Sequence, residues 1–453
     1  MKTVFNISVL LGLIGLFSQC EQLTPTKISG ERKIIANQMD SLLLNNLVHS
    51  WYPKSIDTLY GGYLSTFDSA FIPVGKQDKM IVSQSRHLWN NSKAAAHFPN
   101  DRPYLEYARH GFKFLKEKMW DQDRGGFYFM VDRAGNPIGD TAKTAYGNAF
   151  GLYSISAYYL ASKDPEALDL AKKTFHWLET HSHDSIYKGY FQNLDKYGSI
   201  VKRPVNSIPN SEIGYKDQNS SIHLLEALTE FYQAWPDPLV KTRLEEMIYL
   251  IRDKITNEKG NLILFFQPDW TPVSLRDSSK EVVLKNYGID HASFGHDIET
   301  AYLLMEASHI AGWKDDTITW RKAKRMTDQC LMYGWDDAVG GFYDAGYYFK
   351  GEPSISIIGD GKNWWTQSEG LNTLLIMSDL YPNDPLHYFE KFKKQWSYIQ
   401  NYLIDYKHGD WYSNGLDKDP NAIHGTKGNI WKAAYHQYRS LENCIFRLKG
   451  EHE

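Results

Sequence analysis

The sequence contains little cysteine, with three residues among 453: Cys20, Cys330 and Cys444. Three thiols cannot build the disulfide framework that stabilises small secreted domains. A single bridge between Cys330 and Cys444 stays open as an alternative, and we expect two separate buried thiols instead. A fold that depends on many disulfides is therefore excluded.

Basic clusters and metal-binding motifs are absent as well. Lysine and arginine number 50 against 54 acidic residues, for a formal net charge of −4 at pH 7, and they form no run or stripe. A nucleic-acid partner is therefore not expected. No H-E-x-x-H motif occurs, and the spacing of His291 and His296 does not match two ligands one helical turn apart. We expect no metal and no other cofactor.

A long apolar run occurs at the N-terminus, where Lys2 precedes the nine residues from Val9 to Phe17, VLLGLIGLF. Because this run is too short to span a membrane, it indicates a signal peptide of residues 1–20. Cys20 follows the apolar core directly, as in bacterial lipoproteins. We expect export to the periplasm or the outer membrane, with membrane anchoring through lipidated Cys20. An ordinary cleaved signal peptide is the alternative.

The chain after the signal peptide is interpreted as a linker followed by one domain. Residues 21–35 are polar and are interpreted as a linker. Length alone allows two or three domains in the rest. A repeat that runs along the whole of residues 36–453 favours a single catalytic domain, which we expect to be a monomer.

A short phrase returns six times along the chain. It consists of one or two glycines, an aromatic or aliphatic pair and, in most copies, an aspartate in a turn, as in GGYLSTFD and GGFYFMVD. The reference glycines are separated by 64, 63, 71, 81 and 68 residues, and they are Gly62, Gly126, Gly189, Gly260, Gly341 and Gly409. Six copies at a fairly regular spacing are typical of a repeat architecture.

Two segments with helical periodicity lie between successive copies. In residues 223–235 the apolar side chains recur along one stripe, namely Leu224, Leu228, Phe231 and Trp235. Six helix pairs that close into a ring give an all-α fold, the (α/α)₆ barrel or toroid, with short β-hairpins gathered at one end. An open superhelix is the competing geometry.

Polar residues stand out on two of these helical segments. Arg86 and Trp89 share a helix face, where a guanidinium can grip sugar oxygens beside a stacking ring. Asn219, His223 and Glu226 project from one turn region near the start of a helix. Each motif also has an ordinary structural interpretation, an arginine lying over a packed tryptophan or a histidine that starts a helix. Aromatic residues make up 14% of the chain, which suits a carbohydrate cleft or simply large packed helices.

Two histidines occupy corresponding places in different repeats. His296 opens a helix, and Glu299 follows one turn later, placed to accept a hydrogen bond from the imidazole and to fix its tautomer. His436 follows the last phrase, next to Trp431 and Tyr435. The pair is a candidate for acid/base chemistry.

Together these motifs resemble the N-acylglucosamine 2-epimerase superfamily, and most closely its cellobiose/mannobiose 2-epimerase branch. The similarity covers nearly the whole chain after the signal peptide. Two positions depart from the family pattern: Ala433 and Ala434 replace a pair such as Cys-Pro, and Ser221 replaces a histidine. The segments that carry the resemblance are Arg86 and Trp89; Lys143, Tyr146 and Phe150; Asn219, His223, Glu226 and Ala227; Gly295, His296, Asp297 and Glu299; Trp364, Trp365, Gln367 and Glu369; and Trp431, Lys432, Tyr435 and His436.

The resemblance implies a sugar 2-epimerase that opens the ring, removes the proton at C2 and passes through a cis-enediolate. It implies that His296 and His436 are the acid/base pair and that His223 assists ring opening or polarises O1. Arg86 and Asn219 would hold the enediolate charge. Glu299 would orient His296. The other substrate-binding residues that we infer are Tyr146, Glu226, Trp365, Trp411 and Trp431.

Four alternatives remain open at this stage. An aldose–ketose isomerase of the same superfamily would share the intermediate. A glycoside hydrolase on the same toroid would need two carboxyl groups, which Asp297, Glu226 or Glu369 can supply. A metal enzyme would use the histidines as ligands, and a sugar-binding lipoprotein could dispense with them. We expect the partner to be a small-molecule sugar or an oligosaccharide.

Overall fold

The computed structural model describes residues 30–201 and 215–451. The predicted signal peptide and most of the predicted linker lie outside the described residues. The end of that linker, residues 30–35, belongs to helix α1 (Gly30–Leu42), because the buried face of this helix already begins at Ile35. Within the described part of the chain, no helix is long and apolar enough to cross a membrane.

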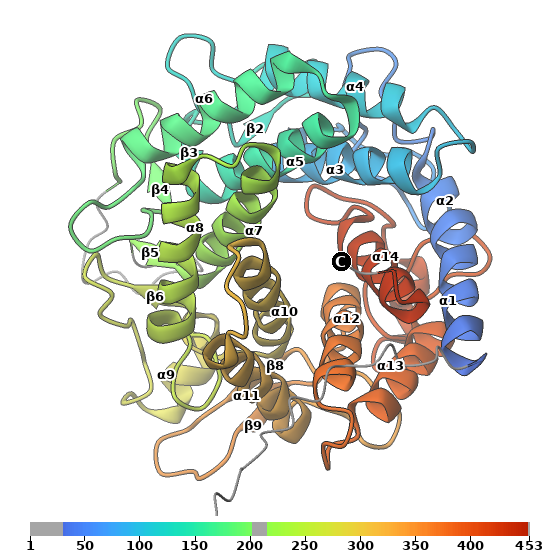
Figure 1. Cartoon of the computed structure of the whole chain (residues 1–453), viewed down its shortest axis with the longest axis vertical. Coiled ribbons are helices and arrows are strands. Elements are labelled where there is room, and N and C mark those ends of the chain that lie inside the picture. Colours follow the sequence, from blue (N-terminus) through green and yellow to red (C-terminus); the bar gives the residue numbers. More distant parts are fainter. Residues whose placement is uncertain (1–29, 202–214, 452–453) are drawn as a thin grey trace, which may run out of the picture.

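The long helices form two concentric rings (Figure 1). The inner ring consists of α3 (Ile81–His97), α5 (Ala145–Ser162), α7 (Gln218–Ala234), α10 (Phe294–Ile310), α12 (Trp364–Leu380) and α14 (Tyr435–Lys449). The outer ring consists of α1, α4 (Tyr104–Phe114), α6 (Pro165–His181), α8 (Pro238–Leu250), α11 (Thr317–Tyr333) and α13 (Tyr388–Tyr402).

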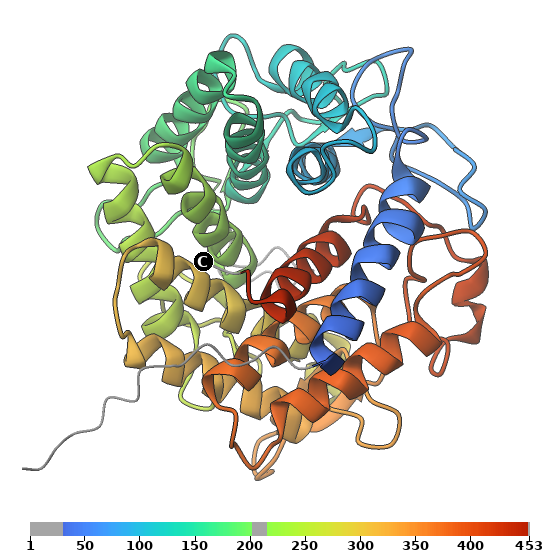
Figure 2. The ribbon, with the colours of Figure 1, turned by 45° about the vertical axis from the view of Figure 1, so that its right-hand side comes forward.

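The ring is closed by its last helix. Each inner helix packs against the next, and α14 packs against α12, α3 and α1. Figure 2 shows α1 lying along α14 where the chain returns to its start. The predicted all-α toroid is therefore confirmed, and the open superhelix is wrong.

Shorter elements complete the chain. Two brief helices are α2 (His49–Trp51) and α9 (Lys280–Lys285). Wider π-helical turns span Leu43–Val48, Leu115–Met119 and Ile251–Ile255, and 3₁₀ turns span Tyr287–Ile289 and Pro420–His424. Cys330 and Cys444 are both buried and free, so two separate thiols are confirmed.

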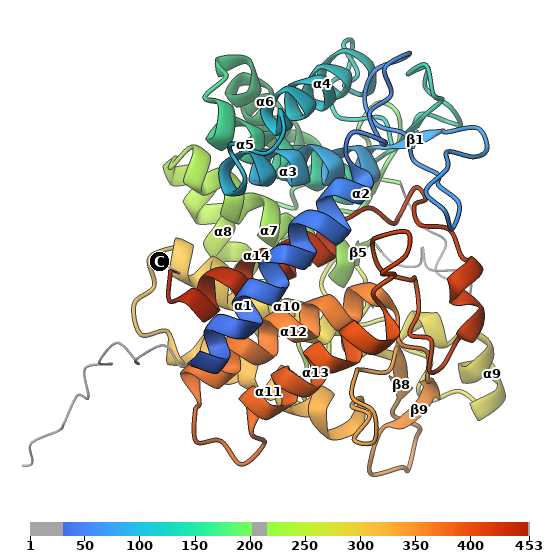
Figure 3. The same ribbon diagram turned by 90° about the vertical axis from the view of Figure 1, so that its right-hand side faces the viewer.

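The predicted hairpins gather at one end of the toroid (Figure 3). Each phrase closes on a single bridge, as between Trp120 and Phe127. The regular strands instead join neighbouring repeats in antiparallel pairs. These strands are β1 (Lys79–Met80) with β2 (Met130–Val131), β3 (Lys143–Thr144) with β4 (Asn193–Leu194), β5 (Lys216–Asp217) with β6 (Phe265–Phe266), and β7 (Ala292–Ser293) with β8 (Ala345–Tyr347) and β9 (Ser356–Gly359).

A lysine with a fully buried side chain precedes five of the inner helices and fastens the hairpin end to the ring. Its ammonium group pairs with a buried or nearly buried aspartate, as in Lys143 to Asp121 at 2.8 Å. The other pairs are Lys79–Asp57, Lys216–Asp184, Lys362–Asp336 and Lys432–Asp410. The repeat that contains α10 has neither member of this pair. Ala292 replaces the lysine, and Asn257 replaces the aspartate. Because both charged residues are absent from this repeat, neither one is left buried without its partner.

The fifth residue after this lysine position holds the hairpin backbone. The side chains of Gln84, Asn148, Asp297 and Gln367 accept the backbone N–H groups of Tyr63, Phe127, Leu262 and Phe342, at 2.8 to 2.9 Å. The carboxylate of Asp297 thus does the work that amides do in three other repeats. Its place in the fold is structural.

Candidate active site

The centre of the toroid is lined by one residue from each inner helix, the seventh after the lysine position. These residues are Arg86, Phe150, His223, Glu299, Glu369 and Arg439. They contact one another across the ring: the Arg86 guanidinium lies 4.9 Å from the Phe150 ring centre, and the Phe150 ring lies 4.7 Å from that of His223. One repeated position therefore brings five charged or titratable groups together in the interior.

Arg439 binds three carboxylates at the centre of the toroid. Its Nη2 lies 2.6 Å from Oε1 of Glu299 and 2.6 Å from Oε1 of Glu369, and its Nη1 donates to Oε1 of Glu226. Three buried carboxylates share one buried guanidinium, so the four side chains together keep two negative charges when all are ionised. Only arginine presents enough donors in a rigid plane to serve all three partners.

His223 is held by a carboxylate on its own helix. Its Nδ1 lies 2.9 Å from Oε2 of Glu226, one turn away on α7. The other oxygen of Glu226 accepts from the hydroxyl of Tyr435 and from Arg439. Although burial opposes ionisation, Arg439 and His223 hold the pKa of Glu226 at about 2, so this residue stays a carboxylate.

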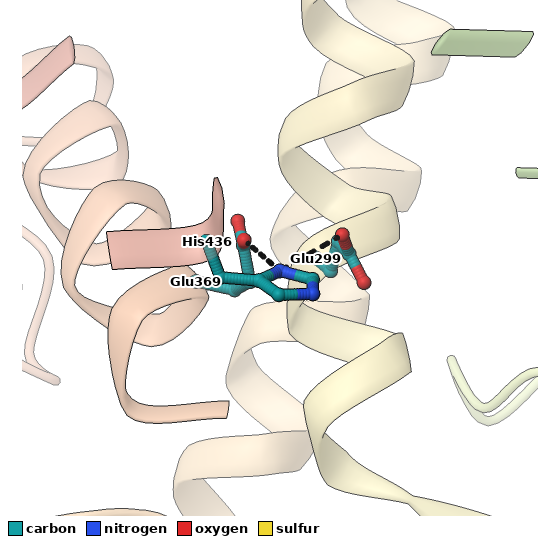
Figure 4. A group of neighbouring side chains, drawn as sticks. All are labelled: Glu299, Glu369 and His436. Atoms are coloured by element: carbon teal, nitrogen blue, oxygen red, sulfur yellow. Dashed lines mark hydrogen bonds and ion pairs between the residues drawn. The ribbon is translucent and has the colours of Figure 1, made fainter. Parts of the chain in front are cut away.

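His436 is also held by a carboxylate, as Figure 4 shows. Its Nδ1 lies 2.8 Å from Oε1 of Glu369 and 3.8 Å from Oε1 of Glu299. Burial and then the nearby Arg86 lower the pKa of His436 well below its usual value, although Glu299 opposes this. The imidazole is therefore neutral in the free protein, which a general base requires.

His296 has a different partner. Its Nδ1 lies 2.9 Å from the hydroxyl of Ser293, and its ring lies 4.7 Å from that of Trp365. The Trp365 ring is also 5.8 Å from the ring of His436, so one indole touches both histidines. Burial lowers the pKa of His296 to about 3, which keeps this imidazole neutral too.

The expected bond from Glu299 to His296 is not made, and that prediction is wrong. One oxygen of Glu299 accepts from Arg439, and the other has no hydrogen-bond partner in the described residues. The reason is the helical geometry: Glu299 lies in the central layer and faces Arg439, whereas His296 bonds back to the residue that precedes its helix.

A cavity of about 930 Å³ opens beside His296 at the hairpin end. Tyr146, Asn219, His296 and Trp431 line it, and all four were predicted from the sequence. Its wall also includes apolar residues, namely Phe129, Ile138, Leu264 and Phe265, and polar residues, namely Asp140, Thr141, Gln192, Asn193, Gln218 and His291. A wall of this mixed kind suits a ligand that has both CH faces and hydroxyl groups.

Trp431 on the cavity wall is held by Arg86, another predicted residue. Arg86 donates from Nη1 to the carbonyl of Trp431 at 2.5 Å, and its guanidinium lies 5.1 Å from the Tyr435 ring centre. Trp431 is 47% exposed, so its ring is free to stack on a ligand. Arg86 thereby fixes the backbone that carries this tryptophan.

Trp411 was also predicted to stack on sugar, and this prediction is wrong. The side chain is 1% exposed and is not part of the cavity wall. Trp411 pairs with Ile404 in the last hairpin, where it fills the core between the rings. The sequence could not separate a packed indole from a ligand platform at this position.

The carboxyl groups of a glycoside hydrolase are already engaged elsewhere. Asp297 holds the backbone N–H of Leu262, and Glu226 and Glu369 bind Arg439. A hydrolase needs one protonated acid and one carboxylate on either side of a glycosidic bond. In this site Arg439 links the two glutamates instead.

Glu299, Glu369 and His436 also form the one group among the described residues that could hold a metal ion, with ligand atoms within 4.8 Å of one another. Arg439 already places a guanidinium nitrogen 2.6 Å from both carboxylates. The positive charge that these carboxylates need is thus supplied by the chain. This donor set fits a metal poorly because the arginine occupies the shared space.

Two residues of the site, Arg439 and Ser293, were missed in the sequence. Arg439 lies three residues after His436 on α14, and Ser293 lies three residues before His296. Their only sequence signal is this spacing from a histidine that the sequence had singled out. Glu369 was noted within its motif and as a possible carboxyl group of a hydrolase, but not as the partner of His436.

The comparisons with known proteins agree with this geometry. The N-acylglucosamine 2-epimerase (GlcNAc 2-epimerase) family model matches residues 62–440. A cellobiose 2-epimerase of Dictyoglomus turgidum is 29% identical over 411 residues, which cover 89% of this chain and 97% of that protein. One from Ruminococcus albus is 30% identical over 408 residues, with the same coverage of 89% and 97%.

A solved structure is also similar. The cellobiose 2-epimerase of Bacillus thermoamylovorans superposes with a TM-score of 0.80 at 25% identity, covering 91% of this chain and 99% of that one. A closed toroid in which His296 and His436 share the Trp365 ring beside a cavity, in a chain with these relatives, is a carbohydrate epimerase or isomerase. The chain belongs to the N-acylglucosamine 2-epimerase family.

Proposed function

We propose that this protein inverts C2 of the reducing-end sugar of a short oligosaccharide by proton transfer through His296 and His436. The observation that carries the proposal is the pair of neutral histidines, half-buried His296 and buried His436, that share the Trp365 ring, each with its Nδ1 already engaged. In both imidazoles Nε2 is then the nitrogen that remains for a ligand. Family membership supports the same assignment.

The chemistry follows from the acidity of the sugar. The hydrogen at C2 is acidic only when C1 is an open-chain carbonyl, so the ring must open first. One histidine then takes the C2 proton, the C–H electron pair moves into a cis-enediolate, and the second histidine returns a proton to the opposite face. We assign to His223 the proton exchange of ring opening, as the resemblance to the family implies.

Charge stabilisation comes from cations near the centre. Arg86 is buried beside Phe150 and Tyr435, and Arg439 lies one turn beyond His436. In such a site a fixed cation stabilises a developing enediolate more than water does. Glu299 and Glu369 each retain one buried oxygen without a partner among the described residues, available to accept sugar hydroxyl groups.

The substrate class rests on the cavity and the relatives. A cavity of about 930 Å³ exceeds what a single sugar ring needs, and the exposed Trp431 stands on its wall. The relatives named above are cellobiose 2-epimerases. We therefore favour a β-1,4-linked disaccharide with a glucose or mannose unit at the reducing end.

The test is turnover in D₂O. The protein is incubated with β-1,4-linked disaccharides and with free glucose and mannose, and the reducing end is followed by NMR. Epimerisation places deuterium at C2 and yields the C2 epimer. A ketose product would instead show the aldose–ketose isomerase, and shorter sugars without deuterium at C2 would show a hydrolase.

Histidine variants sharpen this test. His296→Gln and His436→Gln should each reduce turnover by about 10²–10⁴-fold, the usual contribution of an acid/base group. His309→Gln is the matched control, because His309 is an exposed residue at the other end of the same helix as His296. If either site variant keeps the control's rate, that histidine is not in the mechanism.

The location of the enzyme is a separate proposal drawn from residues outside the described structure. Export with lipid anchoring through Cys20 predicts that the protein in its bacterial host incorporates radiolabelled palmitate and sediments with membranes. Cys20→Ser should abolish the label. Release of an unlabelled wild-type protein would indicate an ordinary signal peptide.

A further inference from the structure

In three of the six repeats, the residue before the inner helix caps its first turn. The side chains of Thr144, Asp217 and Asn363 accept the N–H of the third helical residue of α5, α7 and α12. Ser293 holds the same place before α10, and its hydroxyl makes no capping bond. It bonds Nδ1 of His296 instead. The hydroxyl of Ser293 therefore bonds to a histidine side chain, whereas the equivalent side chains of Thr144, Asp217 and Asn363 bond to the helix backbone.

The two catalytic histidines therefore have chemically different partners. A carboxylate such as Glu369 only accepts, so it fixes the proton of neutral His436 on Nδ1 and leaves a lone pair on Nε2. A hydroxyl both donates and accepts. Ser293 can thus support either neutral tautomer of His296.

We propose that Ser293 is a positioning residue that lets His296 present either an N–H or a lone pair to the sugar without a change in charge. The inference rests on the proposed epimerase function. When Ser293 donates to Nδ1, the proton is on Nε2, and neutral His296 donates a hydrogen bond to a sugar oxygen. When Ser293 accepts from Nδ1–H, the Nε2 lone pair takes the C2 proton and the C–H electrons enter the enediolate.

Two neutral tautomers of His296 suit a reaction with two successive steps. Ring opening needs a donor at a sugar oxygen, and the next step needs a base at C2. The titratable groups that face His296 are His223 from α7, His291 from the segment before β7 and His436 from α14, with no carboxylate bonded to it. Ser293 is therefore the group that sets the tautomer of His296.

The fold supplies the variants for the test. Ser293→Thr keeps the hydroxyl, and Thr144 occupies the equivalent place before α5. Ser293→Asp places an acceptor-only carboxylate there, as Asp217 does before α7. Ser293→Ala removes the partner. Asp237→Ala is the control for general loss of a helix cap, because Asp237 caps the outer helix α8.

The expected kinetics separate positioning from stability. Ser293→Thr should stay within about 3-fold of wild type. Ser293→Ala should lower kcat by about 10-fold or more, less than the 10²–10⁴-fold of losing the histidine itself, with KM little changed. Ser293→Asp should move the acidic limb of the kcat/KM profile upward by about one pH unit or more, since an anion favours imidazolium. Asp237→Ala should lower only the melting temperature.

A direct readout does not depend on turnover. In protein labelled with ¹⁵N-histidine, the His296 signal is identified by its loss in His296→Gln and is titrated in each variant. The inference predicts a higher pKa for His296 in Ser293→Asp and altered nitrogen shifts in Ser293→Ala. Unchanged titration and unchanged pH profiles in both variants would overturn it. Absence of deuterium at C2 with the wild-type enzyme would defeat the proposed function alone, because the titration still reports the Ser293 bond.

Discussion

Arg439 and Glu369 meet at a single oxygen: Nη2 of Arg439 lies 2.6 Å from Oε1 of Glu369, and the same oxygen accepts from Nδ1 of His436 at 2.8 Å. The arginine and the histidine lie on consecutive turns of α14. One carboxylate oxygen of Glu369 thus binds both the arginine and the histidine. Any change in the guanidinium is transmitted to the imidazole through one shared acceptor.

Arg439→Met should destabilise the protein severely, because it leaves buried Glu226, Glu299 and Glu369 without their cation. Breaking a buried ion pair from one side costs about 3–5 kcal/mol, which urea unfolding would measure. Arg439→Lys keeps the charge but not the planar set of donors. It should fold with reduced stability and lose at least about 10-fold in kcat, since His436 loses the fixed position of its acceptor. Full activity in Arg439→Lys would contradict this role.

Much of the fold was predictable, because it depends on a repeat that is visible in one dimension. The six glycine phrases gave the closed toroid, and the histidines followed from motifs near helix starts. Arg439 was not predictable in the same way. Its partner Glu299 is 140 residues away, and only closure of the ring brings the two together. The prediction for Trp411 was wrong because an indole near a hairpin can face either the ligand or the core, and the sequence does not show which.

Trp431→Ala should weaken binding of a disaccharide more than binding of a monosaccharide. Its ring is exposed on the cavity wall, and stacking of this kind contributes about 0.5–1.5 kcal/mol, or roughly 2- to 12-fold in KM. Trp411→Phe is the control: it should lower the melting temperature and leave KM unchanged, because Trp411 is buried in the core. Equal KM effects on both sugars would remove Trp431 from an outer sugar site.

His97 should make stability depend on pH where the ring closes. Its Nδ1 lies 3.3 Å from Glu442 of α14 and its Nε2 lies 3.2 Å from Asp40 of α1. Although burial opposes it, these carboxylates raise the pKa of His97 above its ordinary 6.5. The stabilisation is therefore fully present below about pH 6.5 and is lost as the pH rises through the raised pKa.

The measurement is the urea midpoint from pH 5.5 to 9 for wild type and His97→Gln. The difference between the two proteins should be largest at the acidic end and should shrink with rising pH. His309→Gln serves again as an exposed histidine control. A difference that grows toward alkaline pH would show that His97 is not bound as the cation.

Asp297→Asn separates a structural carboxylate from a catalytic acid. Burial raises the pKa of Asp297 to about 7, so its contribution to stability is present at low pH and is lost as the pH rises through 7. Asparagine keeps the acceptor for the N–H of Leu262, as Asn148 does in α5, and Asn261 can turn its unpaired oxygen to meet the new amide. The variant should match wild type below about pH 4, unfold at higher urea concentration above pH 8, and keep kcat/KM within about 10-fold, far from the 10²–10⁴-fold loss of an acid/base residue. A collapse of turnover in a folded Asp297→Asn protein would place this carboxyl in the reaction and revive the glycoside hydrolase.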